Sequence, residues 1–270
     1  KIGSFGNSVI PVEKGELASG LFGDGRMTEP EQIVEYLQNN FFLIPTSQAG
    51  RDKPLQGKKA LVTAGPTYEP IDPVRFIGNH SSGKMGVAIA KELYQQGAEV
   101  TLVMGPSPIE LPANGIAVKR VTTAAEMLEA CEPVFEKADI TVMSAAVADF
   151  TPINTAEEKI KKKEGGLTVE LKKTTDILQS LGKNKKNGQV LVGFALETTN
   201  ERAYALEKLE KKNADLIVLN SLNDEGAGFG HDTNKITIFG KKGEEFRFDT
   251  KSKTEVAHDI VDTIIRLYYA

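Results

Sequence analysis

Apolar residues along most of the chain recur with two alternating spacings, one typical of buried strands and one typical of amphipathic helices. The predicted strands cover residues 59–64, 99–104, 117–121, 139–145, 190–195 and 215–219. The predicted helices cover residues 84–96, 123–137, 174–183, 200–213 and 252–268. Near the end of the chain, residues 235–239 and 244–248 are separated by a turn rich in glycine and lysine, which predicts a late β-hairpin.

This alternation predicts an α/β fold, namely a Rossmann-like, doubly wound, mostly parallel sheet with helices on both faces. In such sheets ligands bind beyond the carboxyl ends of the strands, where the strand order reverses. We therefore expect the loops that begin at Gly65, Ala145, Ala195 and Asn220 to share one rim of the sheet.

The first part of the chain has a different texture. Glycine-rich turns occupy residues 15–25, a helix is predicted over 29–40, and a polar stretch follows. We expect an appendage at 1–44, a linker at 45–57 and the main domain at 58–270. The chain begins at Lys1 without an initiator methionine, which favours a fragment or a processed product.

Composition narrows the class of protein. Apolar residues make up 40% and charged residues 26% of the chain, which is ordinary for a globular protein. A net charge of -4 argues against a general nucleic-acid or membrane-surface binder, and no apolar run approaches the length of a membrane span. The single cysteine, Cys131, lies in a helical context and is interpreted as a small buried residue. We expect a cytoplasmic protein.

The long loop Thr63–Gly86 carries the most specific chemistry, and two familiar phosphate motifs fail in it. GNHSSGK at 78–84 fits the glycine and lysine spacing of a P-loop, but Met85 stands where a hydroxyl should bind magnesium. The dinucleotide fingerprint G-x-G-x-x-G is absent. What remains is a cradle of Ser81, Ser82 and Gly83 at a helix start, which suits phosphate. The alternative is a serine that merely caps the helix.

Four motifs in this order resemble a known family. The runs GPTYEPIDPVR, NHSSGKMG, SAAVADF and EKIKK resemble phosphopantothenoylcysteine synthetase of coenzyme A biosynthesis, over residues 57–270. Residues 15–31 resemble the tail of the flavin-dependent decarboxylase that many bacteria fuse ahead of it. Ser19 stands where that family usually has cysteine, so we expect neither decarboxylation nor bound flavin on this fragment, whose residues 1–44 would be a decarboxylase remnant.

The resemblance implies a ligase. It would join 4'-phosphopantothenate to cysteine, use CTP with Mg²⁺, pass through an acyl-cytidylate, and release pyrophosphate and then CMP. It also implies a homodimer that is tethered to a decarboxylase domain in the full-length protein. The alternatives are a non-catalytic nucleotide-binding module and a Rossmann-like oxidoreductase, and the missing dinucleotide fingerprint disfavours the second.

The resemblance also assigns residues. Lys159 would stabilise the triphosphate in the first half-reaction, so Lys84 of the near-P-loop is set aside, and Asn79 would serve amide formation as a neutral amide donor. Without the family, the lysine run reads as a solvated face and Asn79 as a turn residue. The residues expected to contact the nucleotide are Gly65, Ser81, Ser82, Gly83, Met143, Ser144, Ala145, Asp149, Thr175, Asp176, Ile177, Leu178, Phe194, Lys208 and Lys212.

Several polar residues stay open. Asp72 is a structural or magnesium-linked carboxylate and Arg75 a partner for the substrate phosphate, or the two form a local ion pair. His80 has an accessory or packing role. The other histidines lack companions at metal-ligand spacing, so no zinc site is expected, and the magnesium ligand is unknown.

Overall fold

The computed structural model describes residues 10, 13–16, 22–30, 32–33, 53–109, 115–161, 166–197, 199–221 and 232–270. By their internal contacts, residues 1–52 and 53–270 form two separate units. In the smaller unit, β1 (Glu13–Glu16) and β2 (Phe22–Arg26) pair antiparallel. Residues 30, 32 and 33 are helical, and the rest of the helix predicted over 29–40 lies outside the described residues.

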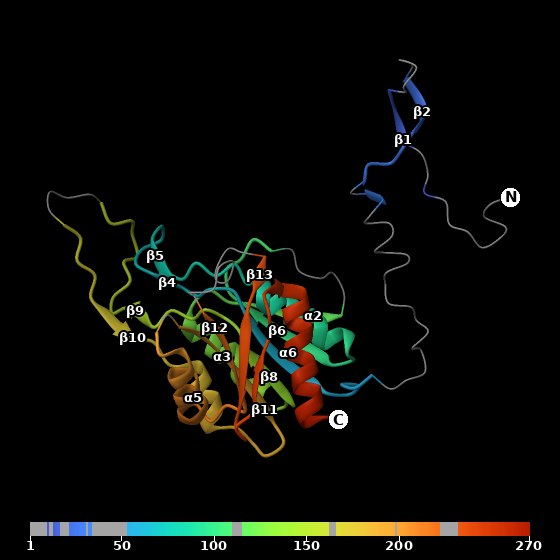
Figure 1. Cartoon of the computed structure of the whole chain (residues 1–270). Helices are drawn as coiled ribbons and strands as arrows, with labels where there is room; N and C mark the ends of the chain where they lie inside the picture. Colours follow the sequence, from blue (N-terminus) through green and yellow to red (C-terminus); the bar gives the residue numbers. More distant parts are fainter. Residues whose placement is uncertain are drawn as a thin grey trace. The chain divides into compact units, whose positions relative to one another are not determined.

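The larger unit, seen in Figure 1, is built on a central sheet. This sheet has eight strands in the order β15-β14-β12-β11-β8-β3-β6-β7. Its strands are β3 (Lys59–Ala64), β6 (Glu99–Met104), β7 (Ile116–Arg120), β8 (Ile140–Met143), β11 (Val190–Glu197), β12 (Leu216–Ser221), β14 (Ile236–Gly240) and β15 (Glu245–Arg247). The strands from β12 to β7 run parallel, while β14 and β15 are antiparallel. The chain moves outward from β3 to β7 and then returns to β8 on the other side of β3, so the strand order reverses between β3 and β8.

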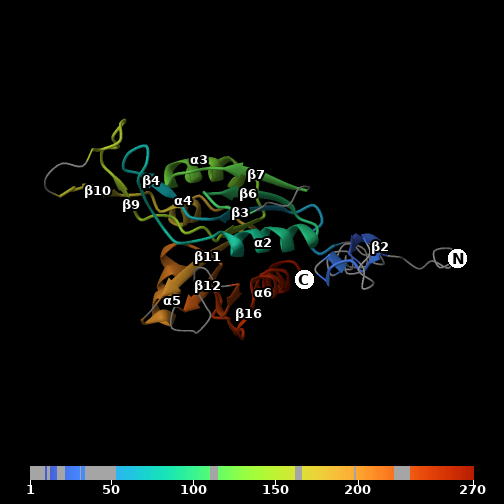
Figure 2. The same ribbon diagram turned by 90° about the horizontal axis from the view of Figure 1, so that it is seen from above.

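Helices cover both faces of this sheet. The helices are α2 (Lys84–Gln95), α3 (Ala124–Phe135), α4 (Ile177–Lys183), α5 (Glu201–Lys211) and α6 (Lys253–Tyr268). Apolar side chains of α2 and α6 pack with alternate strand residues such as Val62 and Val192 into one core layer. Those of α3, α4 and α5 pack with the intervening residues, such as Leu61 and Leu191, into the other. Figure 2 shows α2 and α3 on opposite sides of the strands between them.

The predicted doubly wound α/β fold and late hairpin are confirmed, with small shifts at the element ends. The strand predicted over 139–145 ends at Met143, because the Ala145 N–H donates to Thr63 Oγ1 instead of to a neighbouring strand. The helix predicted from 174 begins at Ile177, because Asp176 caps it.

The sequence patterns did not predict two short hairpins. One pairs β4 (Tyr68–Pro70) with β5 (Phe76–Gly78) inside the long loop, and the other pairs β9 (Phe150–Pro152) with β10 (Leu171–Lys173). Each strand has only three residues, and prolines stand in β4 and β9, so no period-two pattern marks them. A further pair joins β13 (Thr233–Asn234) to β16 (Lys251–Ser252), just before α6.

At the end of the sheet where its parallel strands begin, the carboxylate of Asp215 accepts hydrogen bonds from the Lys185 ammonium group and from the backbone near the start of β11. Its two oxygens each accept a hydrogen bond from Lys185 Nζ at 2.8 Å, and Oδ2 also accepts from the Leu191 N–H at 2.8 Å. The side chains of Lys185 and Asp215 are only 9% and 15% exposed. A pair this buried depends on its hydrogen bonds to offset the loss of hydration.

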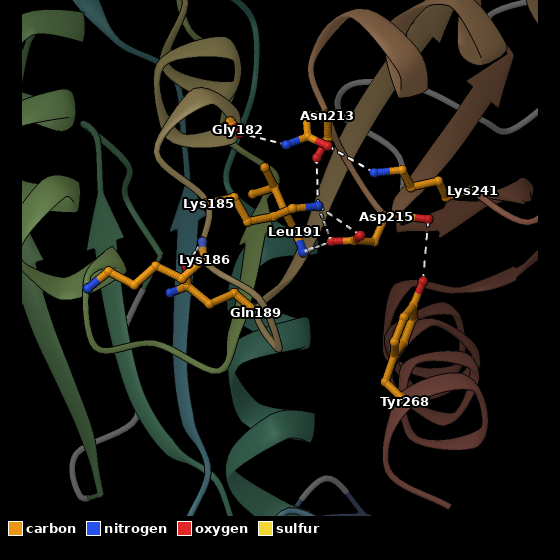
Figure 3. Close-up of polar contacts among 9 residues, drawn as sticks. All are labelled: Gly182, Lys185, Lys186, Gln189, Leu191, Asn213, Asp215, Lys241 and Tyr268. Atoms are coloured by element: carbon orange, nitrogen blue, oxygen red, sulfur yellow. Dashed lines mark hydrogen bonds and ion pairs between the residues drawn. The ribbon is translucent and has the colours of Figure 1, made fainter.

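The neighbouring Asn213 and the Asp215 backbone extend this cluster to three more elements (Figure 3). Asn213 Nδ2 donates to the Gly182 carbonyl at the end of α4, and Asn213 Oδ1 accepts from Lys241 of the hairpin turn. The Tyr268 hydroxyl of α6 donates to the Asp215 carbonyl at 3.5 Å. The cluster therefore holds the ends of α4, α5 and α6 against the base of the sheet.

We predict that Asp215→Ala destabilises the chain by about 3 kcal/mol, because it leaves the Lys185 ammonium buried without its carboxylate. The double variant Lys185→Met/Asp215→Asn keeps an acceptor for the Leu191 N–H and removes both charges, so its loss should be smaller than that of the single variant. Urea unfolding measures both free energies. A double variant that is less stable than Asp215→Ala would contradict the prediction, and Glu99→Gln, in an exposed ion pair, is the control.

Candidate active site

A cavity of about 750 Å³ lies beyond the carboxyl ends of β8, β11 and β12 and beside the amino end of α2. This is the side of the sheet and the reversal point at which doubly wound folds bind ligands. Its wall is formed by Asn79, Ser81 to Gly86, Met143 to Val147, Asp149, Phe150, Lys173 to Leu178, Phe194 to Leu196, Lys208, Asn220, Asn234 and Lys253. Loops after three different strands thus meet in one cavity, as the shared rim predicts.

Most residues expected to contact the nucleotide line this cavity. They are Ser81, Ser82, Gly83, Met143, Ser144, Ala145, Asp149, Thr175, Asp176, Ile177, Leu178, Phe194 and Lys208, and Asn79 joins them. Three expected residues, Gly65, Lys159 and Lys212, are not part of the wall. Of these, Gly65 and Lys212 contact residues that are.

The cradle at the start of α2 is formed by glycine instead of by a capping serine. Gly83 is the N-cap, at φ +84°, and no side-chain hydrogen bond caps the helix. The alternative in which Ser81 or Ser82 is the N-cap of α2 is therefore wrong, and Ser81 Oγ instead accepts from the Gly83 N–H at 3.3 Å. A Cβ on Gly83 would lie 3.1 Å from the Gly65 backbone nitrogen, so Gly65, also at positive φ, packs directly behind the cradle. Only glycine fits this close approach without strain.

Two buried threonines hold the loop that follows β8. Thr63 Oγ1 accepts from the Ala145 N–H at 3.1 Å, and Thr67 Oγ1 accepts from the Ala148 N–H at 2.9 Å. Backbone bonds from Ala146 to Gly65 and from Thr67 to Ala146 complete the connection. Ser144 Oγ is buried on this loop and has no hydrogen-bond partner among the described residues. A ligand with a polar group at that point would satisfy it.

Asn79 reaches across the cavity to the same loop. Its Nδ2 donates to the Ala146 carbonyl at 3.0 Å and to the Val147 carbonyl at 3.2 Å. Both amide hydrogens are therefore used, and the atom left to a ligand is the acceptor Oδ1. The donor role expected for Asn79 does not agree with this arrangement.

The α4 and α5 side of the cavity is held by an ion pair. Asp176 caps α4 by accepting from the Gln179 N–H at 2.8 Å, and its other oxygen lies 2.9 Å from Lys212 Nζ. Burial raises the pKa of Asp176, but the hydrogen bonds from Lys212 and Gln179 outweigh it and lower the pKa below its ordinary value. Lys212 thus supports a wall residue, whereas Lys208, one turn earlier, lines the cavity itself.

Asp72 and Arg75 form a local ion pair, which was one of the open alternatives. Asp72 is buried and accepts from the Val74 and Arg75 N–H groups at 2.8 Å, from the Ile160 N–H at 3.1 Å and from the Arg75 guanidinium. Burial raises the pKa of this carboxyl, but these hydrogen bonds together hold it well below its usual range. Arg75 also donates to the Ile160 carbonyl. The exposed Lys159 is consequently held next to the β4–β5 hairpin.

His80 and Cys131 both lie outside the cavity wall. His80 is exposed. Cys131 is buried, as predicted, and burial raises its pKa to about 12. Within the described ranges no three His, Cys, Asp or Glu side chains gather as a metal site, and no helix is long and apolar enough to cross a membrane.

Sequence reasoning missed several polar wall residues, among them Asn220, Asn234 and Lys253. Asn220 was expected only as the start of a rim loop, and Asn234 and Lys253 were not expected at all. The β13–β16 pair brings Asn234 and the start of α6 to the end of β12, where Asn234 Nδ2 donates to Asn220 Oδ1 at 3.1 Å. Because this pairing joins two-residue strands far apart in sequence, no local pattern reveals it.

Comparison with known proteins places this geometry in a family. Residues 55–268 match the model of the "DNA/pantothenate metabolism flavoprotein C-terminal domain". A crystal structure of the C-terminal domain of coenzyme A biosynthesis bifunctional protein CoaBC is similar at a TM-score of 0.68 with 41% identity, covering 80% of this chain and 97% of that one.

Two curated relatives match nearly the whole chain. The Bacillus subtilis "Coenzyme A biosynthesis bifunctional protein CoaBC" is 45% identical over 97% of this chain, which spans 63% of its length. A "Cysteine/Cysteine sulfinic acid decarboxylase" from an unknown prokaryotic organism is 50% identical over 98% of this chain and 73% of its own length. The chain therefore belongs to the family of the DNA/pantothenate metabolism flavoprotein C-terminal domain.

Proposed function

We propose that this chain is a ligase that joins 4'-phosphopantothenate to L-cysteine at the expense of CTP, through an acyl-cytidylate. The observation that carries the proposal is the single cavity at the strand reversal, which brings Asn79, the Met143–Asp149 loop and the glycine cradle together. The family match and the similarity to a coenzyme A biosynthesis protein support the same activity. A module that only binds a nucleotide would not need the Asn79 amide between the loop after β8 and the glycine cradle.

The base of CTP would lie against the loop after β8. Cytosine presents an exocyclic amine and a ring nitrogen, which the strand-end backbone and the Asp149 carboxylate can pair with. The partnerless Ser144 Oγ offers one more polar contact. Small side chains at Ala145 and Ala146 allow a flat base to approach. The preference for CTP over ATP rests on the family resemblance.

In the first half-reaction a carboxylate oxygen of 4'-phosphopantothenate bonds to the α-phosphorus of CTP, and the bond to the bridging oxygen breaks. Pyrophosphate leaves with the electron pair, so nearby cations lower the barrier. Lys208 stands on the cavity wall for this purpose. From the resemblance we retain Lys159, which would have to turn from its exposed place beside the β4–β5 hairpin toward the triphosphate.

In the second half-reaction the amine of cysteine bonds to the acyl carbon, CMP leaves, and the amine loses a proton. Asn79 would act through Oδ1, which can accept a hydrogen bond from the attacking amine and align its lone pair with the carbonyl. At the same time the Asn79 Nδ2 bonds keep the base loop in place. Asn79 thereby connects nucleotide binding to amide formation.

Magnesium would be held mainly by the triphosphate, with one or two carboxylates and water completing its shell. Asp149 is assigned to the base, and Asp176 caps α4 and pairs with Lys212, so phosphate oxygens and water would supply most of the shell. The described wall therefore fits a metal that arrives with its nucleotide.

Similarity to a protein named as a decarboxylase suggests a second activity to consider, the decarboxylation of cysteine or cysteine sulfinic acid. We assign decarboxylation to the part of such proteins that lies ahead of the matched family domain, because the cavity here is lined by groups suited to a nucleotide. Residues 1–44 are then a remnant of a decarboxylase domain that is tethered to this one in the full-length protein. We place the enzyme in the cytoplasm.

An exposed apolar surface supports a homodimer. The β4–β5 and β9–β10 hairpins and the segments that adjoin them carry most of the large apolar side chains exposed in the larger unit, namely Val74, Phe76, Phe150, Ile153, Leu167 and Leu171. The Phe76 ring, 51% exposed by residue, stacks on Tyr68 at 3.8 Å between centroids. Apolar groups gathered in this way indicate a protein interface. We propose that a second copy of the chain covers it.

The ligase assay follows pyrophosphate while the chain is incubated with 4'-phosphopantothenate, cysteine, Mg²⁺ and either CTP or ATP. We expect release that requires both CTP and 4'-phosphopantothenate, because both form the acyl-cytidylate. Release of CO₂ from cysteine is measured in parallel and should stay at background. Absence of nucleotide-dependent pyrophosphate with either nucleotide would refute the ligase.

The two half-reactions should separate in variants. Asn79→Asp puts a carboxylate against two carbonyl oxygens, so we expect amide formation to fall about a hundredfold or more, while pyrophosphate release persists at saturating CTP. Lys159→Gln should block pyrophosphate release itself. Single-turnover assays with labelled CTP resolve the acyl-cytidylate, and Asn187→Asp, an exposed position, is the matched control. Equal, small effects of Asn79→Asp and Lys159→Gln on both steps would count against these roles.

Phe76→Asp should convert the dimer to a monomer, because a carboxylate would be buried without a partner in the apolar interface. Sedimentation velocity measures the change, and Tyr204→Asp, at an exposed aromatic on α5, should leave the mass unaltered. A dimer that persists in Phe76→Asp would place the interface elsewhere.

A further inference from the structure

Two helices begin with a lysine at the same cavity. Lys84 is the first residue of α2 and Lys253 the first residue of α6, and both side chains line the wall. Figures 1 and 2 show α2 and α6 side by side, and the Glu92 and His258 side chains connect them at 3.0 Å. The two ammonium groups therefore enter one space from two neighbouring helix starts.

A lysine at the first position of a helix, as at Lys84 and Lys253, does not stabilise that helix. The amino end of a helix carries partial positive charge, so a cation there is unfavourable. The first turn of α2 contains no acidic residue to compensate, whereas that of α6 contains Glu255. Burial lowers the pKa of Lys253 below its ordinary value, and the nearby charge of Lys84 lowers it further, against an opposing effect of Asp232. Cations gathered in this way are suited to a polyanion.

Asp232 is a counter-ion that a ligand can replace. Its carboxylate contacts Lys84 Nζ, yet the Asp232 side chain is 84% exposed. An ion pair with one partner in water contributes little to stability, so the contact opens at small cost. The Asp232 carbonyl meanwhile accepts from the Lys253 N–H at 3.0 Å, which keeps Asp232 beside the start of α6.

Lys253 lies about two strand spacings from the proposed base site. The base loop follows β8, whereas Lys253 stands with Asn220 and Asn234 at the end of β12, two strands further along the sheet. Two strand spacings amount to about 10 Å. An extended nucleoside triphosphate spans about that distance from its base to its last phosphates.

We propose that Lys84 and Lys253 bind the β- and γ-phosphates of the nucleoside triphosphate and the pyrophosphate that leaves. This inference rests on the proposed function. When the α-phosphorus bonds to the substrate carboxylate oxygen, the electron pair of the broken P–O bond stays on pyrophosphate, and the two ammonium groups stabilise the added charge. They are separate from Lys159 and Lys208, and the failed P-loop match at Met85 does not exclude phosphate from Lys84.

The test compares three ligands by calorimetry on the full chain: CTP, CMP and inorganic pyrophosphate. Each charge-assisted contact is expected to change affinity about tenfold to a hundredfold. Lys84→Gln and Lys253→Gln should therefore weaken CTP and pyrophosphate by that factor and leave CMP within about threefold. Lys91→Gln, at an exposed lysine further along α2, is the matched control and should alter none of the three.

Equal weakening of CMP and CTP, or unchanged CTP and pyrophosphate, would overturn the assignment. If the unaltered chain binds neither CMP nor CTP, the proposed function itself fails, and pyrophosphate binding then tests the lysine pair alone. Asp232→Asn should strengthen pyrophosphate binding a few fold, because the competing counter-ion is gone. Weaker binding in Asp232→Asn would show that Asp232 supports the fold of this corner and would contradict its place as a counter-ion.

Discussion

The hydrogen bonds from the loop after β8 to the residues after β3 are the constraint on which the site depends. Thr63 and Thr67 are fully buried and accept from Ala145 and Ala148 with their hydroxyls. These bonds replace the ladder that the two strands can no longer form as they separate at the reversal point. A cavity at this point would otherwise leave backbone N–H groups unsatisfied. The same bonds present the loop carbonyls that Asn79 contacts.

The opposite edge of the sheet supplies the rigidity that an open cavity lacks. Asp215 and Lys185 anchor α4 and α5 at their carboxyl ends, and Gly182 is so close that an added Cβ would lie 1.9 Å from the Lys212 carbonyl oxygen. Because α4 and α5 are fixed there, Asp176 and Lys208 at the other side keep their places on the wall. Two apolar core layers stabilise the sheet. The fold can therefore tolerate the repulsion between the lysines that line the cavity.

The fold could be predicted in advance because its information is local. Buried strands such as β3 and β8 are short runs of mostly apolar residues, and α3 and α6 start at capping boxes, which are local sequence patterns. Part of the site follows from the same reasoning, since loops after parallel strands must share one rim. The short hairpins were not predicted because strands of three residues are too short to show a periodicity.

By itself the sequence determined the doubly wound architecture, the edge at which ligands bind and the family resemblance, because each depends on patterns within a few residues. Only the tertiary structure decided how single side chains are used. Asn79 became an acceptor because two carbonyls take its hydrogens, and Asp72 paired with Arg75. Lys84 and Lys253, 169 positions apart in the numbering, came together because α2 and α6 pack on one face of the sheet. Such contacts join distant segments, so no local pattern encodes them.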